Sequence, residues 1–196
     1  MPFQPVTSQP VLQVIVCGSP LAADIGEVLV PAVRDGWDVW VVASEYGIRF
    51  LDADAAEAVT GHPVHYRYRH PDDPVDVPYA DAIVVVPATC NTLAKWTAGI
   101  CDTLALGLLV EAYGRGCPVT VVPFSNRAQA SHPAVVDSIG RLRGWGVNVL
   151  FGDDFFPLHE PGTGTQVQRA FPWGRVREEI ARMRSSAPCR PWSKSG

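Results

Sequence analysis

The run from Ile83 to Val86 is the feature that most constrains how this chain can fold. Four consecutive apolar residues of this kind are typical of a strand buried on both faces, as in a parallel sheet. The run stops at Pro87, which has no N–H for the ladder, so we expect the strand to end there. A helical pattern follows at 91–98. Residues 89–92 are therefore predicted to stand at the carboxyl edge of the sheet, where ligands of open α/β proteins bind.

Strands and helices alternate along most of the remaining chain. Such alternation indicates an α/β fold with a parallel sheet and right-handed crossovers. The predicted strands are 11–17, 37–43, 82–87, 118–122 and 146–151. The predicted helices are 20–35, 51–60, 91–98, 103–113, 132–144 and 173–185.

Composition narrows the class of protein. A chain of 196 residues with 47% hydrophobic residues can bury a stable core without disulfides or structural metals. Its net charge of −4 argues against a nucleic-acid partner. No apolar run approaches the ~18 residues of a membrane span, and no leader pattern opens the chain, so we expect a cytoplasmic protein with no membrane partner. No pair among the five cysteines has C-x-x-C spacing, and we expect no disulfides. These cysteines are Cys17, Cys90, Cys101, Cys117 and Cys189.

The turn Gly18-Ser19-Pro20 joins the first strand to its helix. Ser19 suits an N-cap and Pro20 the first helical position, while Gly18 lets the backbone approach a ligand closely. The orphan amides of such a helix start can bind an anion. An ordinary capped turn has the same residues, and no Walker or G-x-G-x-x-G pattern is present. Both interpretations stay open on the residues alone.

Residues 87–102, PATCNTLAKWTAGICD, resemble the "PASANT" signature of the flavin-dependent cysteine decarboxylases. That family includes phosphopantothenoylcysteine decarboxylase and enzymes acting on the C-terminal Cys of ribosomal peptides. The resemblance covers roughly residues 11–151. It implies a flavodoxin- or Rossmann-like three-layer α/β/α sandwich, FMN as cofactor, and homo-oligomers that are trimers or dodecamers of trimers. Identities fall at Pro87, Asn91, Thr92, Lys95, Gly99 and Asp102, with Thr89 for Ser and Cys90 for Ala.

The resemblance also implies which residues bind the flavin. Gly18, Ser19 and Pro20 correspond to the loop that holds the FMN phosphate. The remaining cofactor positions follow other strands and are Ser44, Glu45, Thr89, Cys90, Asn91, Thr92 and Phe124.

A second family signature, P-x-M-N-x-x-M-W, is kept only at Pro123 and Asn126. Ser125, Gln129 and Ala130 replace its two Met and its Trp. The family Asn contacts the substrate carboxylate, and a neutral amide can donate to such a group. Asn126 is equally suited to a turn after a strand.

The family's catalytic His, which precedes the PASANT strand, has no direct match. Asp73 aligns with it and His70 is the nearest histidine, so we take both as candidate bases. The spacing of His62, His65 and His70 fits no standard metal site, and none is expected. The segment 152–173 corresponds to a substrate flap but lacks the family's Cys. Its His159 and Glu160 are either acid–base groups or solvated loop residues.

The favoured hypothesis is an FMN-dependent oxidative decarboxylase of a cysteine-like carboxylate, peptidyl or small, with an atypical active site. A flavin prenyltransferase and a non-catalytic FMN-binding regulatory subunit are the alternatives. The predicted organisation is a disordered arm at 1–10, an FMN-binding domain at 11–151, a flap at 152–173, and a helix with a tail at 174–196.

Overall fold

The computed structural model describes residues 9–68, 70, 72 and 77–185. In this part of the chain five parallel strands form one sheet in the order β2-β1-β3-β4-β5. This order is flavodoxin-like, so the predicted α/β fold with a parallel sheet is confirmed. The strands are β1 (Val11–Val16), β2 (Asp38–Ala43), β3 (Ala82–Ala88), β4 (Val119–Pro123) and β5 (Asn148–Val149).

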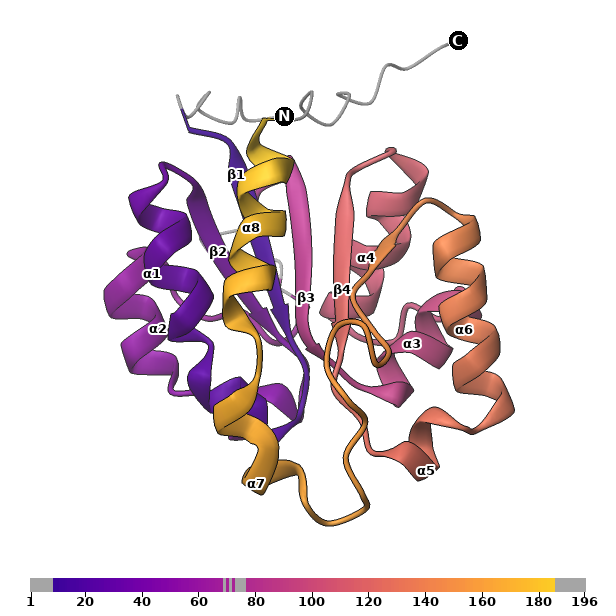
Figure 1. Cartoon of the computed structure of the whole chain (residues 1–196). Coiled ribbons are helices and arrows are strands. Elements are labelled where there is room, and N and C mark those ends of the chain that lie inside the picture. Colours follow the sequence, from indigo (N-terminus) through magenta and orange to yellow (C-terminus); the bar gives the residue numbers. More distant parts are fainter. Residues whose placement is uncertain (1–8, 69, 71, 73–76, 186–196) are drawn as a thin grey trace, which may run out of the picture.

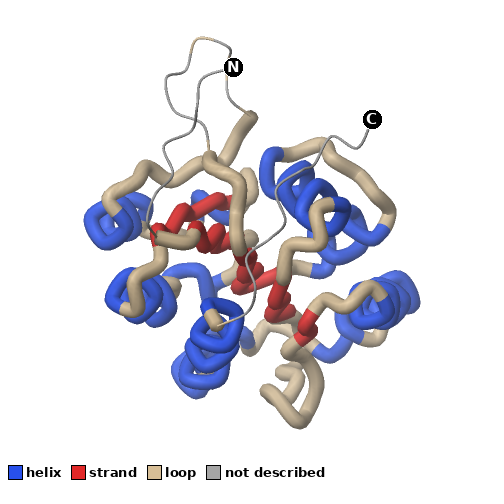
Figure 2. The backbone as a smooth tube through the Cα atoms, turned by 90° about the horizontal axis from the view of Figure 1, so that it is seen from above, coloured by secondary structure: helices blue, strands red, loops and turns tan. Residues whose placement is uncertain are grey.

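Helices cover both faces of the sheet, as Figures 1 and 2 show. One layer contains α1 (Gly26–Arg34), α2 (Ala53–Thr60) and α8 (Trp173–Arg184). The other contains α3 (Cys90–Thr97), α4 (Leu104–Gly114) and α6 (Pro133–Gly144). The shorter helices are α5 (Arg127–Ala130), α7 (Gly164–Val167) and the 3-10 turns η1 (Pro20–Asp24), η2 (Gly47–Arg49) and η3 (Gln168–Ala170).

The sequence of β1 explains why two layers form. Val14 and Val16 belong to the core beneath α1, whereas Ile15 and Cys17 belong to the core beneath α3. Because successive side chains point to opposite faces, an unbroken apolar strand must be covered on both sides. In the described part of the chain, no helix combines the length and apolarity that a bilayer span requires.

The clearest departures from the predicted boundaries concern α1, β3 and β5. The helix after Ser19 starts as the 3-10 turn η1, and α1 begins only at Gly26. Strand β3 continues through Pro87, because the Pro87 carbonyl accepts from Cys17 N at 3.0 Å and the Ala88 carbonyl accepts from Phe124 N at 3.0 Å. Strand β5 is shorter than predicted, since this edge strand pairs only with β4.

A polar cluster fastens the segment after α2 to the outer edge of the sheet. The Asp38 carboxylate accepts from Trp40 Nε1 at 3.1 Å and lies 2.7 Å from His62 Nε2. The His62 ring stacks on Trp40 with centroids 3.8 Å apart. His62 is therefore a structural residue in this fold.

We expect Asp38→Ala to lower the free energy of unfolding by about 1–3 kcal/mol, because it removes the shared acceptor of two partly buried donors. Urea denaturation measures the change. The matched control is Asp137→Ala on the exposed face of α6, for which a change within about 0.5 kcal/mol is expected. Equal effects of the two substitutions would contradict this role of Asp38.

Candidate functional site

A cavity of about 380 Å³ opens at the carboxyl edge of the sheet. It lies where the strand order reverses, since β2 was added to one side of β1 and β3 to the other. Such a switch point is the usual ligand site of open α/β folds, and the volume is that of a small-molecule site. The cavity is lined by Gly18, Ser44, Glu45, Tyr46, Thr89, Asn91, Thr92, Lys95, Thr103, Ala105 and Leu106.

Close packing of two loops forms one wall. A Cβ added at Gly18 would lie 2.8 Å from Tyr46 Cβ, and one added at Gly47 would lie 2.1 Å from the Val16 carbonyl oxygen. Ser44 closes this turn, because its hydroxyl accepts from Gly47 N at 3.0 Å. Glycine at both positions is what lets the loop after β2 rest against the end of β1.

The start of α3 forms the facing wall. Thr89 caps the helix by accepting from Thr92 N at 3.4 Å. The buried Thr92 hydroxyl lies 3.1 Å from Thr89 Oγ1 and 3.1 Å from Cys17 Sγ, which ties the helix to β1. Burial raises the pKa of the Cys17 thiol more than its hydrogen bonds lower it, so this cysteine is a neutral packing residue.

Six of the ten predicted cofactor residues line this cavity: Gly18, Ser44, Glu45, Thr89, Asn91 and Thr92. The other four do not line it. Ser19 is buried and caps η1, Pro20 is the first residue of η1, and Cys90 is the first residue of α3. Phe124 lines a different, smaller cavity.

Sequence reasoning missed several lining residues. Lys95 also lines the cavity and pairs with Asp102 at 2.5 Å. Tyr46 comes from the turn after β2, and the start of α4 contributes Thr103, Ala105 and Leu106. The only local signal for the α4 residues was the N-cap Thr103 before an apolar run.

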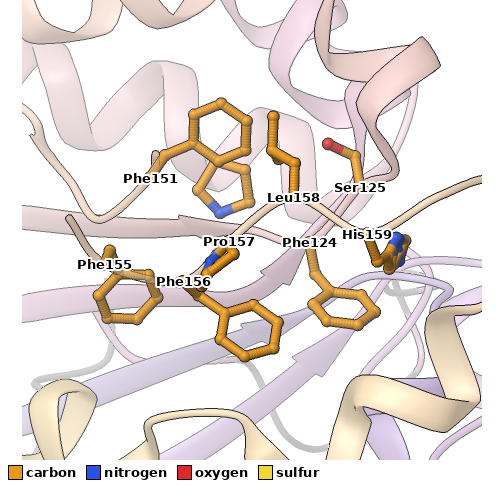
Figure 3. A pocket seen from close by; sticks show the side chains of 9 residues that line it. Phe124, Ser125, Phe151, Phe155, Phe156, Pro157, Leu158 and His159 are labelled. Carbon is orange, nitrogen blue, oxygen red and sulfur yellow. The ribbon is translucent and has the colours of Figure 1, made fainter. Parts of the chain in front are cut away.

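The second cavity, of about 10 Å³, lies at the end of β4 beneath the segment 152–173 (Figure 3). Aromatic side chains hold this segment on the sheet. The Phe171 ring lies 5.9 Å from Phe124, 5.4 Å from Phe156 and 4.8 Å from Trp173 between centroids. The lining residues are Pro123, Phe124, Ser125, Phe151, Phe155, Phe156, Pro157, Leu158 and His159.

Asn126 stands where this segment meets the sheet. Its Oδ1 caps α5 by accepting from Gln129 N at 2.9 Å. Asn126 pairs with His159 in a parallel bridge, and Arg127 N donates to the His159 carbonyl at 2.8 Å. Arg127 and Glu160 add an ion pair at 3.2 Å. The segment 152–173 thus contacts the predicted substrate-binding residue directly.

Of the two candidate bases, His70 does not join this group. His70 has a side chain that is 73% exposed and lies 3.3 Å from the Asp72 carboxylate, and it lines neither cavity. Asp73 lies outside the described residues. Within the described ranges, no group of three or more His, Cys, Asp or Glu side chains is arranged to hold a metal ion.

Comparisons with known proteins place this chain in a family. A model of the Flavoprotein family matches residues 6–181. The coenzyme A biosynthesis bifunctional protein CoaBC of Mycolicibacterium smegmatis is 37% identical over 119 residues, which are 59% of this chain and 28% of that protein. The chain thus spans little more than a quarter of this curated relative.

Solved structures give the same result for the fold. The epidermin biosynthesis protein EpiD from Staphylococcus aureus has a TM-score of 0.58 at 25% identity, covering 71% of this chain and 81% of that chain. The FMN-dependent cysteine decarboxylase TvaF from thioviridamide biosynthesis has a TM-score of 0.66 at 22% identity, covering 91% and 100%. The resemblance in the PASANT-like segment is confirmed: this chain belongs to the Flavoprotein family and is homologous to phosphopantothenoylcysteine decarboxylases and FMN-dependent cysteine decarboxylases.

Proposed function

We propose that this protein binds FMN at the carboxyl edge of its sheet and oxidatively decarboxylates a cysteine-like carboxylate on a peptide or small molecule. The observation that carries the proposal is that the Gly18 turn and the PASANT-like segment meet at one cavity of about 380 Å³. Homology to FMN-dependent cysteine decarboxylases supports it.

The residues around this cavity fit FMN in their chemistry. Backbone amides at the start of α3 and after β1 suit a phosphate, and Lys95 adds a cation. Asn91 and Glu45 offer donors and acceptors for the polar groups of a flavin. Leu106 gives an apolar surface for the face of a ring.

When bound, FMN supplies the two-electron acceptor that converts the CH2–S carbon of a cysteine to a thioaldehyde, from which the carboxylate leaves as CO2. The protein binds and orients the substrate. Asn126 donates its side-chain N–H to the carboxylate, a role open to it because its Oδ1 is committed to Gln129 N.

The proposed substrate is a specialised one. The positions of the family His and of the flap Cys are not conserved in this chain, and Ser125 replaces a family Met next to Asn126. We therefore favour a peptide or specialised small carboxylate over the housekeeping coenzyme A precursor. Efficient turnover of phosphopantothenoylcysteine would contradict this choice.

The alternatives have less support. A flavin prenyltransferase needs basic residues for its phosphate-rich substrate, and Arg127 is instead engaged by Glu160 at 3.2 Å. A regulatory FMN-binding subunit would hold a flavin that no thiol reduces. Family resemblance further suggests a homo-oligomer, in which the apolar helix α4 would contact another copy, and light scattering tests that arrangement.

The experiment is anaerobic incubation of the FMN-loaded protein with peptides ending in cysteine, free cysteine and phosphopantothenoylcysteine. We expect the flavin absorption to bleach and the product to be lighter than the substrate by CO2 and two hydrogens. No bleaching by any of them would favour the regulatory alternative.

We expect Asn126→Asp to lower the rate of flavin reduction roughly 100-fold, because a carboxylate replaces the donor that faces the substrate carboxylate. Aspartate keeps the N-cap of α5, so the fold is preserved. Stopped-flow absorbance measures the rate, and an unchanged rate would remove Asn126 from the substrate site.

A further inference from the structure

His159 Nδ1 is buried at the end of β4 and has no hydrogen-bond partner among the described residues. Ser125 Oγ, also buried there, interacts with the Cys90 thiol but lies outside hydrogen-bond geometry. Both residues line the cavity of about 10 Å³, which has room for about one small polar group (Figure 3). Because an unpaired buried donor or acceptor is costly, the His159 nitrogen at this cavity indicates a place for a polar group of a ligand.

His159 is held firmly at this place. Its ring packs edge-on against Phe124 with centroids 5.0 Å apart. Its backbone pairs with Asn126, which sets the two residues about 5 Å apart, the spacing of neighbouring strands. On its other side, a Cβ added at Gly164 would lie 3.2 Å from Nε2, so glycine leaves room for the ring.

Cys90 connects this small cavity to the proposed flavin cavity. Its sequence neighbours Thr89 and Asn91 line the larger cavity. Burial raises the pKa of the Cys90 thiol, and the nearby Ser125 hydroxyl lowers it by a smaller amount. Ser125, which lines the small cavity, thus interacts with the residue that stands between Thr89 and Asn91 of the larger cavity.

We propose that His159 is the general base of this site, that it takes the thiol proton of the substrate at Nδ1, and that Ser125 donates a hydrogen bond to the sulfur. The inference rests on the proposed function and deepens it by assigning the base to a residue beside Asn126, whereas His70 lines neither cavity.

The proposed step is a single proton transfer. The S–H bond of the substrate breaks, its electron pair stays on sulfur as a thiolate, and the proton bonds to Nδ1 to give an imidazolium. Imidazole is the side chain that changes charge closest to neutral pH, and thiolate is the reactive form of a thiol. Next to this residue the charged groups of Arg127 and Glu160 pair with each other at 3.2 Å.

The test is nuclear magnetic resonance of isotope-labelled histidine in the full chain, with and without FMN. The probe is β-mercaptopropionate, which spaces its thiol and carboxylate as cysteine does. At neutral pH, saturation with the probe is expected to convert the His159 ring signals to the imidazolium pattern. The S-methyl analogue, which has no thiol proton, is expected to bind without that change.

Variants assign the effect to this pair. His159→Gln and Ser125→Ala are each expected to weaken probe binding roughly 10-fold, as for loss of a hydrogen bond to a charged group. His132→Asn is the matched control, because it replaces an exposed histidine and keeps the N-cap of α6.

Unchanged His159 signals at the highest probe concentration would overturn the proposal, as would equal imidazolium signals with the S-methyl analogue. Loss of binding in His70→Gln would instead assign the base to the loop before β3. Because the titration is also made without FMN, failure of this step is distinguishable from failure to bind the flavin.

Discussion

Replacing Phe171 by alanine is expected to lower the free energy of unfolding by about 3–5 kcal/mol, the usual cost of removing a buried phenyl ring. Phe171 is 5% exposed and lies at the centre of the aromatic cluster that joins the flap to the sheet. Its ring contacts Phe124 directly after β4, Phe155 and Phe156 in the segment 152–173, and Trp173 at the start of α8. The substitution therefore weakens the packing between the end of β4, the segment 152–173 and the start of α8.

Hydrogen exchange distinguishes flap release from uniform loss of stability. The amides of Phe155 and Phe156, which both donate to the Gly152 carbonyl at 2.9 Å, are expected to exchange faster in Phe171→Ala than amides of the central strands. Phe50→Ala is the control, because Phe50 is 44% exposed, and we expect a change of about 0.5 kcal/mol or less. A similar loss in both variants would contradict the role of the cluster.

Replacing Gly47 by alanine is expected to cost about 3 kcal/mol or more. The added Cβ would lie 2.1 Å from the carbonyl oxygen of Val16, which is backbone within the central sheet and cannot rotate away. The loop after β2 must then move off the end of β1. Because Ser44, Glu45 and Tyr46 in that loop line the cavity, FMN affinity is expected to fall together with stability.

Gly26→Ala is the matched control for Gly47→Ala. A Cβ at Gly26, the first residue of α1, meets no atom within 4 Å. We expect no loss of stability there, and a gain of up to about 1 kcal/mol is reasonable, because alanine restricts the unfolded chain. Denaturant unfolding of both variants decides the comparison. Equal stabilities would show that the loop accommodates the extra carbon.

Sequence reasoning succeeded wherever the determining signal is local. The apolar run before Pro87 predicted the central strand, and Ser19 with Pro20 predicted a helical start, which the structure has as the 3-10 turn η1 capped by Ser19. Each depends on a few neighbouring residues, so the pattern alone suffices. The PASANT-like segment predicted the family for the same reason.

The parts that escaped prediction depend on contacts between distant segments. The requirement for Gly47 comes from Val16, and the bridge between Asn126 and His159 joins the end of β4 to the flap. Proximity in sequence instead suggested His70, which the structure places on an exposed loop. No local pattern reports these distances, because they exist only once the sheet and the flap have packed together.

The measurement that tests the central claim most directly is an absorption spectrum of the purified protein, with mass spectrometry of any released cofactor and titration with added FMN. We expect the bands of oxidised flavin and equimolar FMN. We also expect loss of both in Asn91→Trp, which fills the cavity from the exposed first turn of α3. A colourless protein that fails to take up added FMN would contradict the account, and so would undiminished binding in Asn91→Trp.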